Sequence, residues 1–235
     1  SIEETVCDRK WFPYNKGGDF RKWYGNQEYV VYWKKGPDDK TRGKKSFQDY
    51  YLREYVSWSY MTTSTLATRY FPAGFLWDVS GSGIFDKSNS LKYLQALIGS
   101  NVGIELLKII NSTVNYQVEN ILQLPIIMSD SEKNNIDMIV SENIIISKSE
   151  WDSYEISWDF NVHPLCNNIS RINYPIVLKE KFDEWSRLTS EWTLKIKKNE
   201  ETINKLFIRI YELQDILSEA IQEKDITIRK ADRGG

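Results

Sequence analysis

The feature that most constrains the fold is a heptad repeat between about Val177 and Gln222. Two series of mainly apolar residues recur there every seven positions, and together they alternate steps of three and four. This pattern predicts a long amphipathic helix with one apolar seam, reaching about 65 Å if it is unbroken. The seam positions are Phe182, Thr189, Ile196, Ile203, Ile210 and Leu217 in one series, and Trp185, Trp192, Asn199, Leu206 and Leu213 in the other.

A seam of this length needs a partner helix. The partner could come from this chain, from a further part of a larger protein, or from a second copy through helix-mediated self-association. Thr189 and Asn199 are the polar interruptions of the seam, and Pro175 is expected to open the helix. The polar stretch 161–173 before it reads as a linker.

Near the start of the chain, the run Lys10 to Trp33 combines cationic side chains, planar aromatic side chains and the pair Gly17-Gly18. Glycine lets a backbone approach a partner closely, and cations beside aromatic rings suit a polyanion that carries flat bases. Nucleic acid is therefore one candidate ligand. The alternative is a hydrophobic hairpin with core aromatics and solvated lysines; Trp11 and Trp33 in particular are expected in the core.

The charge is unevenly distributed, although the net charge is only −2. Residues 1–75 contain 13 Lys and Arg against 9 Asp and Glu, whereas residues 76–235 contain 18 against 24. Six of the basic residues form a polar loop between Lys34 and Lys45, which suits contact with phosphates but equally suits a solvated surface.

The local patterns predict a mixed α/β fold of the α+β type. Alternating or β-branched runs predict strands at 28–33, within 50–59 and at 73–79, and apolar periodicity predicts a helix from Leu91 to Ile110. Residues 130–145 are expected to be helical, with Ser149 as a second helix-start signal. The expected divisions are 1–128 as a sheet-containing domain, 129–175 as a helical and loop connector, and 176–235 as the long helix and tail.

Several function classes are disfavoured by composition. Cys7 and Cys166 are too few for a disulfide framework or a CxxC metal site, and His163 is the single histidine, so neither a His-rich zinc site nor a Ser-His-Asp triad is expected. No apolar run reaches a membrane-spanning length, and the first ten residues do not resemble a signal peptide. These observations predict a soluble, cytoplasmic protein without a membrane or metal partner.

Ordered blocks of sequence resemble the C-terminal target-recognition region of bacterial adenine-specific DNA methyltransferases, of the BREX phage-exclusion and type II restriction-modification type. The blocks include YNKGGDFRKWYGN at 14–26, EYVVYW at 28–33, SWSYMTTSTLATRYFPAGFLWD at 57–78, SGSGIF at 80–85, YLQALIGS at 93–100 and KKNEETINKLFIRIYELQD at 197–215. The resemblance implies that residues 91–110 form a helix packed on a sheet and that residues 121–127 form a loop and a strand.

The resemblance implies a DNA sequence-recognition fragment that lacks the catalytic half of the enzyme. An N6-adenine methyltransferase needs an N/D-P-P-Y/F tetrapeptide, and this sequence has none; the nearest text, Asn173-Tyr174-Pro175, has the wrong order. The glycine motif for S-adenosylmethionine is also absent, so no cofactor is expected here, although S-adenosylmethionine is expected for the parent enzyme. The expected partners are double-stranded DNA and the catalytic remainder of the methyltransferase.

Cations, aromatics and hydroxyls in the basic, aromatic part of the chain are the candidate DNA contacts. They are Lys16, Gly17, Gly18, Arg21, Lys22, Trp23, Tyr24, Lys34, Lys35, Lys44, Lys45, Ser64 and Arg69. Two other classes stay open: a protein-interaction scaffold that assembles through the heptad helix, and a carbohydrate-binding module that uses exposed aromatics.

Overall fold

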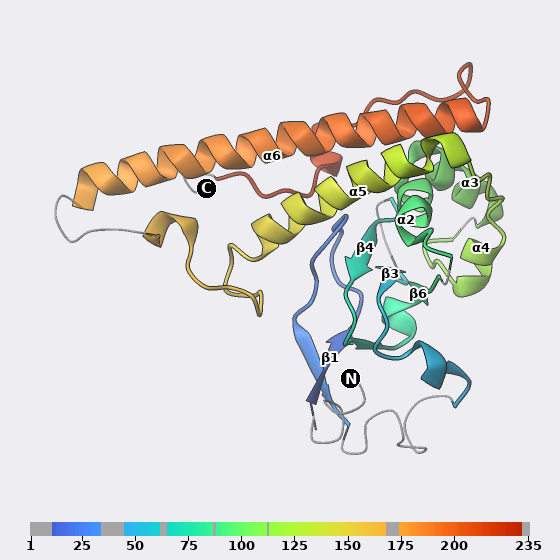
Figure 1. Cartoon of the computed structure of the whole chain (residues 1–235), viewed down its shortest axis with the longest axis horizontal. Helices are drawn as coiled ribbons and strands as arrows, with labels where there is room; N and C mark the ends of the chain where they lie inside the picture. Colours follow the sequence, from blue (N-terminus) through green and yellow to red (C-terminus); the bar gives the residue numbers. More distant parts are fainter. Residues whose placement is uncertain are drawn as a thin grey trace.

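The computed structural model describes residues 11–33, 45–61, 65–86, 88–111, 113–167 and 174–231. Two small sheets lie beneath a layer of helices, so the predicted mixed α/β fold is confirmed (Figure 1). The strands are β1 Trp11–Asn15, β2 Tyr29–Tyr32, β3 Tyr55–Trp58, β4 Thr68–Phe71, β5 Leu76–Trp77 and β6 Gly83–Ile84. The α-helices are α2 Leu91–Gly99, α3 Asn101–Ile110, α4 Val118–Leu122, α5 Asp130–Trp151 and α6 Tyr174–Ile210.

Each sheet has three strands. The first has the order β2-β1-β5, with β1 antiparallel to β2 and parallel to β5. The second has the order β4-β3-β6 and is antiparallel throughout. The fully buried Asn15 ends β1 and joins the two sheets, because its amide donates to Ser57 Oγ at 2.7 Å and to Tyr55 Oη at 3.2 Å in β3.

A strand occurs within each of the three predicted runs, but each strand is shorter than its run. Of the three predicted runs, the first corresponds to β2, the second contains β3 and the third contains only the two residues of β5. The strand expected within 121–127 is wrong, because α4 occupies its first part. The backbone N–H of Gln117 donates to Asn120 Oδ1 at 2.8 Å, and this capping interaction starts a helix where the apolar run had indicated a strand.

The helix predicted for 91–110 is two helices, α2 and α3, bent by 72°. Ser100 interrupts it: its hydroxyl accepts a hydrogen bond from Gly103 N at 3.1 Å and thereby caps α3. A Cβ at Gly103 would lie 2.1 Å from the carbonyl oxygen of Leu97, so the bend requires glycine there.

Among the described residues, no single helix has the length and apolarity needed to cross a membrane. The bent pair α2 and α3 meets that test together, by length and composition alone.

Helix α5 runs further than predicted, and Ser149 lies in its last turns rather than at a helix start. Glu150 and Trp151 are buried at this end against the N-terminal segment. Tertiary packing therefore extends the helix through a serine that, taken locally, resembles an N-cap.

Helix α6 begins at Tyr174, in agreement with the prediction from Pro175, but it ends at Ile210, well before Gln222. Glu212 adopts the left-handed conformation with φ of +57°, and Leu213 N donates to Ile208 O at 2.9 Å, which is the pattern of a Schellman C-cap. The tail then reverses and runs back along α6 (Figure 1), where Ile226 and Ile228 are buried.

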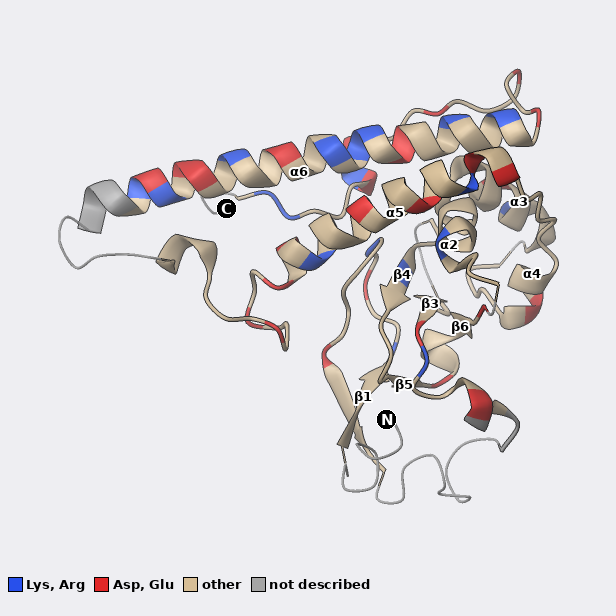
Figure 2. Cartoon of the chain, viewed as in Figure 1, with Lys and Arg blue, Asp and Glu red and all other residues tan. Residues whose placement is uncertain are grey.

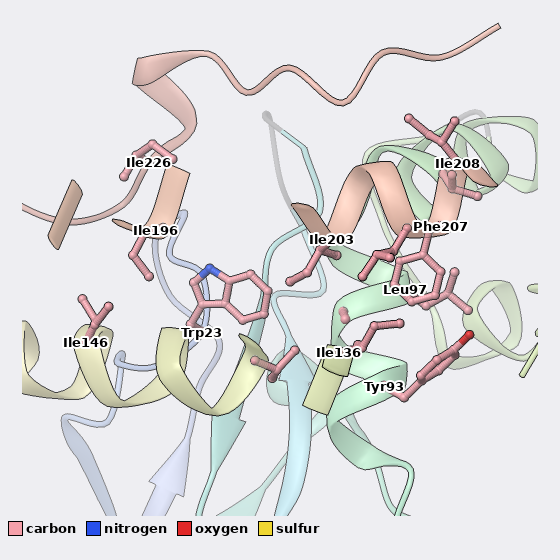
Figure 3. Packing of buried hydrophobic residues seen from close by; sticks show 14 of the residues in the cluster. Trp23, Tyr93, Leu97, Ile136, Ile146, Ile196, Ile203, Phe207, Ile208 and Ile226 are labelled. Carbon is pink, nitrogen blue, oxygen red and sulfur yellow. The ribbon is translucent and has the colours of Figure 1, made fainter. Parts of the chain in front are cut away.

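Within the described structure, the seam of α6 finds its partner in this chain. Ile196, Ile203 and Leu206 belong to the largest core cluster together with Ile136 and Val140 of α5 (Figure 3).

Both polar interruptions of the seam are satisfied. Asn199 donates to Asn143 Oδ1 of α5 at 2.8 Å, and Thr189 Oγ1 accepts from Ala231 N of the tail at 3.1 Å. The seam positions Ile196 and Ile203 thus pack in one cluster with α5 and the returning tail, and the ring of Trp185 lies 6.0 Å from that of His163.

The same cluster draws on all three of the predicted divisions of the chain. Trp23 and Tyr93 come from the first, Ile136 from the second and Ile203 from the third. The domain boundaries remain a prediction, but the hydrophobic core is continuous across them.

Candidate functional site

Three of the predicted DNA-contacting cations lie inside the protein. Lys22 is 7% exposed, and its Nζ lies 2.7 Å from Glu200 Oε2 of α6. The other carboxylate oxygen of Glu200 accepts a hydrogen bond from Trp23 Nε1 at 2.8 Å. One carboxylate of α6 therefore holds two neighbouring side chains of the N-terminal segment.

Arg21 makes the equivalent connection to α5. Its guanidinium forms an ion pair with the fully buried Glu150 and lies over the ring of Trp151 at 4.7 Å, while its Nε donates to Tyr24 O at 2.8 Å. Burial lowers the pKa of Arg21, and the charge of Glu150 opposes that shift.

Arg69 of β4 is completely buried beneath the same segment. Its two terminal nitrogens donate to Arg21 O at 3.2 Å and to Ser59 Oγ at 2.9 Å. Burial lowers the pKa of Arg69 to about 10, and the nearby charge of Arg21 acts in the same direction.

The exposure expected for these side chains is therefore wrong. Arg21, Lys22 and Arg69 are buried, as are Trp23 and Tyr24. Glu150 and Glu200, supplied by remote helices, offset the cost of removing Arg21 and Lys22 from water, whereas the described partners of Arg69 are a carbonyl and a hydroxyl. Contact of these side chains with DNA would require this centre to open.

The glycine pair has an internal explanation. Gly17 and Gly18 both adopt positive φ, at +78° and +109°. A Cβ at Gly17 would lie 2.6 Å from Ser80 O, and one at Gly18 would lie 2.7 Å from Asn26 Nδ2. Glycine is thus required by the turn and its neighbours, whatever the surface contacts.

Among the predicted cations that the structure describes with their side chains, Lys16 lies at the surface. Its side chain is 51% exposed, and its Nζ lies 3.0 Å from Asp78 Oδ2. Partial burial works against the charged form of Asp78, but hydrogen bonds from Lys16, Ser80 N and Tyr14 together lower its pKa. Lys34, Lys35, Lys44 and Ser64 lie outside the described residues, as does the side chain of Lys45.

The hairpin of β1 and β2 carries exposed aromatic side chains. Trp11 is 59% exposed and Tyr29 is 53% exposed, and the ring of Trp11 lies 5.1 Å from that of Tyr32. Trp33 is buried as predicted, whereas the core position predicted for Trp11 is wrong.

Along α6, basic and acidic residues alternate instead of forming a field of one sign (Figure 2).

A cleft of about 940 Å³ opens beside the first sheet, and sequence analysis did not predict it. A continuous series of ring contacts lines it, with centroid distances of 5.1–5.5 Å between successive rings. The series runs through Trp33, Tyr51, Trp77, Phe85 and Tyr50. Because these residues come from four separate segments, no local motif could have indicated the cleft.

Within the described ranges, no three His, Cys, Asp or Glu side chains are grouped so that they could hold a metal ion.

The chain is related to one segment of BREX-type adenine-specific methyltransferases. It is 33% identical over 235 residues to adenine-specific methyltransferase PglX of Lacticaseibacillus casei (strain Zhang), covering 95% of this chain and 19% of that protein. It is 30% identical over 170 residues to adenine-specific methyltransferase BrxX of Escherichia coli O9:H4 (strain HS), covering 70% of this chain and 14% of that protein. The chain thus spans less than a fifth of the length of these relatives. No protein-family model matches it.

Proposed function

We propose that this chain is the DNA target-recognition part of an N6-adenine methyltransferase used in restriction-modification or phage defence. The observation that carries the proposal is the alignment with PglX, which covers 95% of this chain but only 19% of the relative. The chain contains no N/D-P-P-Y/F tetrapeptide, so the proposal assigns catalysis and S-adenosylmethionine binding to other parts of the parent enzyme.

The proposed DNA-contacting surface is the β1–β2 hairpin together with the basic run that follows it in the sequence. Lys16 is a cation at this surface, and Trp11 and Tyr29 are its exposed rings. The basic run 34–45 directly follows β2 in the sequence, and Lys34, Lys35, Lys44 and Lys45 are its proposed phosphate contacts, with Ser64 as a polar contact. Arg21 and Lys22 are left out of the surface because they are buried and paired with glutamates, and Arg69 is left out because it is completely buried.

The test is the binding of this chain to fluorescein-labelled duplex DNA, measured by anisotropy over a series of salt concentrations. Changing Lys34, Lys35, Lys44 and Lys45 together to Ala should lower the affinity and reduce the slope of log K against log salt by about 0.9 for each lost phosphate contact. Lys108→Ala, on the exposed face of α3 and paired with Glu105, is the matched control. An unchanged slope in the fourfold variant would contradict the proposed surface.

The scaffold alternative requires a free apolar seam on α6. Ile196 and Ile203 are 1% and 2% exposed, and both pack within this chain. Assembly through the heptad positions would therefore have to displace α5, which makes DNA recognition the better-supported proposal.

A further inference from the structure

We propose that the aromatic cleft binds one unpaired nucleobase that carries an exocyclic amine, as part of a nucleotide whose phosphate lies at Lys16. This site rests in part on the DNA-binding function proposed above, and it adds a base-specific pocket to what would otherwise be a backbone contact.

The size and lining of the cleft suit a flat heterocycle. Its volume of about 940 Å³ lies near the top of the range of roughly 300–1,000 Å³ that is typical of small-molecule sites. Tyr51, Trp77 and Phe85 contribute neighbouring rings to its wall. Stacking on aromatic rings is the general way in which proteins hold unpaired bases, because every base has a π-face.

Polar groups at the cleft match the edge of a base. The carboxylates of Asp78 and Glu119 are among the lining residues and can accept hydrogen bonds from an exocyclic amine. The indole N–H groups of Trp33 and Trp77 are sealed from solvent and do not face the cleft, so the match to the amine of a base rests on the carboxylates.

The charges disfavour a phosphate inside the cleft. Asp78 is already paired with Lys16 at 3.0 Å, which leaves Glu119, an exposed side chain, as the uncompensated carboxylate of the described lining. No cationic side chain is among those described lining residues. A nucleotide would therefore enter base first.

Lys16 is placed to hold the phosphate of that nucleotide. Its Nζ lies 5.6 Å from the ring centroid of Tyr14 and 3.0 Å from Asp78, both of which line the cleft. Its half-exposed ammonium can contact an anion outside the aromatic wall while the base occupies the interior.

The probes are dAMP, dCMP and dTMP, with deoxyribose 5-phosphate as the probe without a base. Binding to the whole chain is measured by saturation-transfer NMR on the base and sugar protons and by quenching of tryptophan fluorescence. Saturation should reach the base protons of dAMP and dCMP, and deoxyribose 5-phosphate should bind at least tenfold more weakly. Equal binding of the baseless probe, or no saturation of base protons, would overturn the proposal.

Two variants locate the site. Trp77→Leu should weaken dAMP binding at least tenfold, whereas Trp158→Leu, at a half-exposed tryptophan outside the cleft, should leave it unchanged. Glu119→Gln changes only an exposed side chain and so keeps the fold; it should weaken dAMP and dCMP but not dTMP. The site would be rejected if Glu119→Gln binds dAMP with unchanged affinity and Trp77→Leu, when folded, also does. If Trp77→Leu does not fold, an unchanged affinity in Glu119→Gln alone rejects the site.

Duplex binding by anisotropy separates this proposal from the function proposed above. Duplex binding without nucleotide binding rejects the cleft and keeps the recognition role. Nucleotide binding without duplex binding keeps the cleft and rejects the recognition role.

Discussion

Changing Glu200 to Gln should destabilise the protein strongly, because this carboxylate joins the N-terminal segment to α6. Glu200 is 4% exposed, and its two oxygens accept from Lys22 Nζ at 2.7 Å and Trp23 Nε1 at 2.8 Å. A glutamine keeps the shape but has one acceptor oxygen, so its NH₂ group must face one of two donors. It also leaves the ammonium of Lys22 buried without a counter-charge.

Breaking a buried ion pair by removing one partner costs about 3–5 kcal/mol. For a chain of this length, each kcal/mol lowers Tm by about 2–4 °C, so Glu200→Gln should lower Tm by roughly 6–20 °C. Thermal unfolding followed by circular dichroism gives Tm, and urea unfolding followed by tryptophan fluorescence gives the free energy of unfolding, with the slope m compared between variants. The matched control is Glu191→Gln on the same helix, whose exposed pair with Arg187 contributes only about 0.3–0.5 kcal/mol.

A second comparison isolates the ion pair. Lys22→Met combined with Glu200→Gln removes both charges, so the double variant should be more stable than Glu200→Gln alone, since no unpaired ammonium is left inside. A loss below about 1 kcal/mol in Glu200→Gln would refute the reasoning, because it would mean that Lys22 reaches water.

Three further changes test the backbone and the buried phenols. Gly103→Ala should destabilise by about 1–3 kcal/mol in urea unfolding, because its Cβ would lie 2.1 Å from Leu97 O, whereas Gly99→Ala, with its nearest contact at 3.4 Å, should be neutral or stabilising. Glu212→Gly should raise the free energy of unfolding by up to about 1 kcal/mol, since glycine adopts the left-handed C-cap conformation without strain; a loss of stability would contradict the cap. Stability should fall as pH rises above about 10, because the unfolded state releases phenol protons there while burial keeps them bound in the folded state. The lowered pKa values of Arg21 and Arg69 act in the opposite direction but are outnumbered. Absorbance at 295 nm against pH should show delayed phenol ionisation followed by cooperative unfolding. Simple titration at the ordinary pKa would contradict the predicted loss of stability. The phenols with raised pKa are Tyr14, Tyr24, Tyr51, Tyr55, Tyr70, Tyr93, Tyr154 and Tyr211.

Features that depend on neighbouring residues could be predicted from the sequence. Strand β2 follows from its β-branched and aromatic run, and the start of α6 follows from Pro175. The apolar seam also correctly identified Ile196 and Ile203 as buried. The end of α6 could not be predicted, because Leu213 and Leu217 continue the heptad spacing while packing on the core from a reversed tail.

The candidate site was harder to predict, since its chemistry depends on partners far away in the sequence. Arg21 and Lys22 have the composition of a DNA-contacting pair, but their glutamates lie on α5 and α6. Composition cannot distinguish a cation that faces water from one that faces a remote carboxylate. The aromatic residues of the cleft can be read from the sequence, but their proximity to one another depends on how the first sheet packs.

The N-terminal segment and the returning tail meet where the backbone N–H of Lys22 donates to Thr227 Oγ1 at 3.2 Å and Ile226 packs in the same cluster as Trp23. Recombination between related genes that replaced the first part alone would join a foreign segment to a resident tail shaped for another neighbour. Hybrids should therefore be viable chiefly when the N-terminal segment and the tail are inherited together, so that a stable exchange requires two crossovers rather than one.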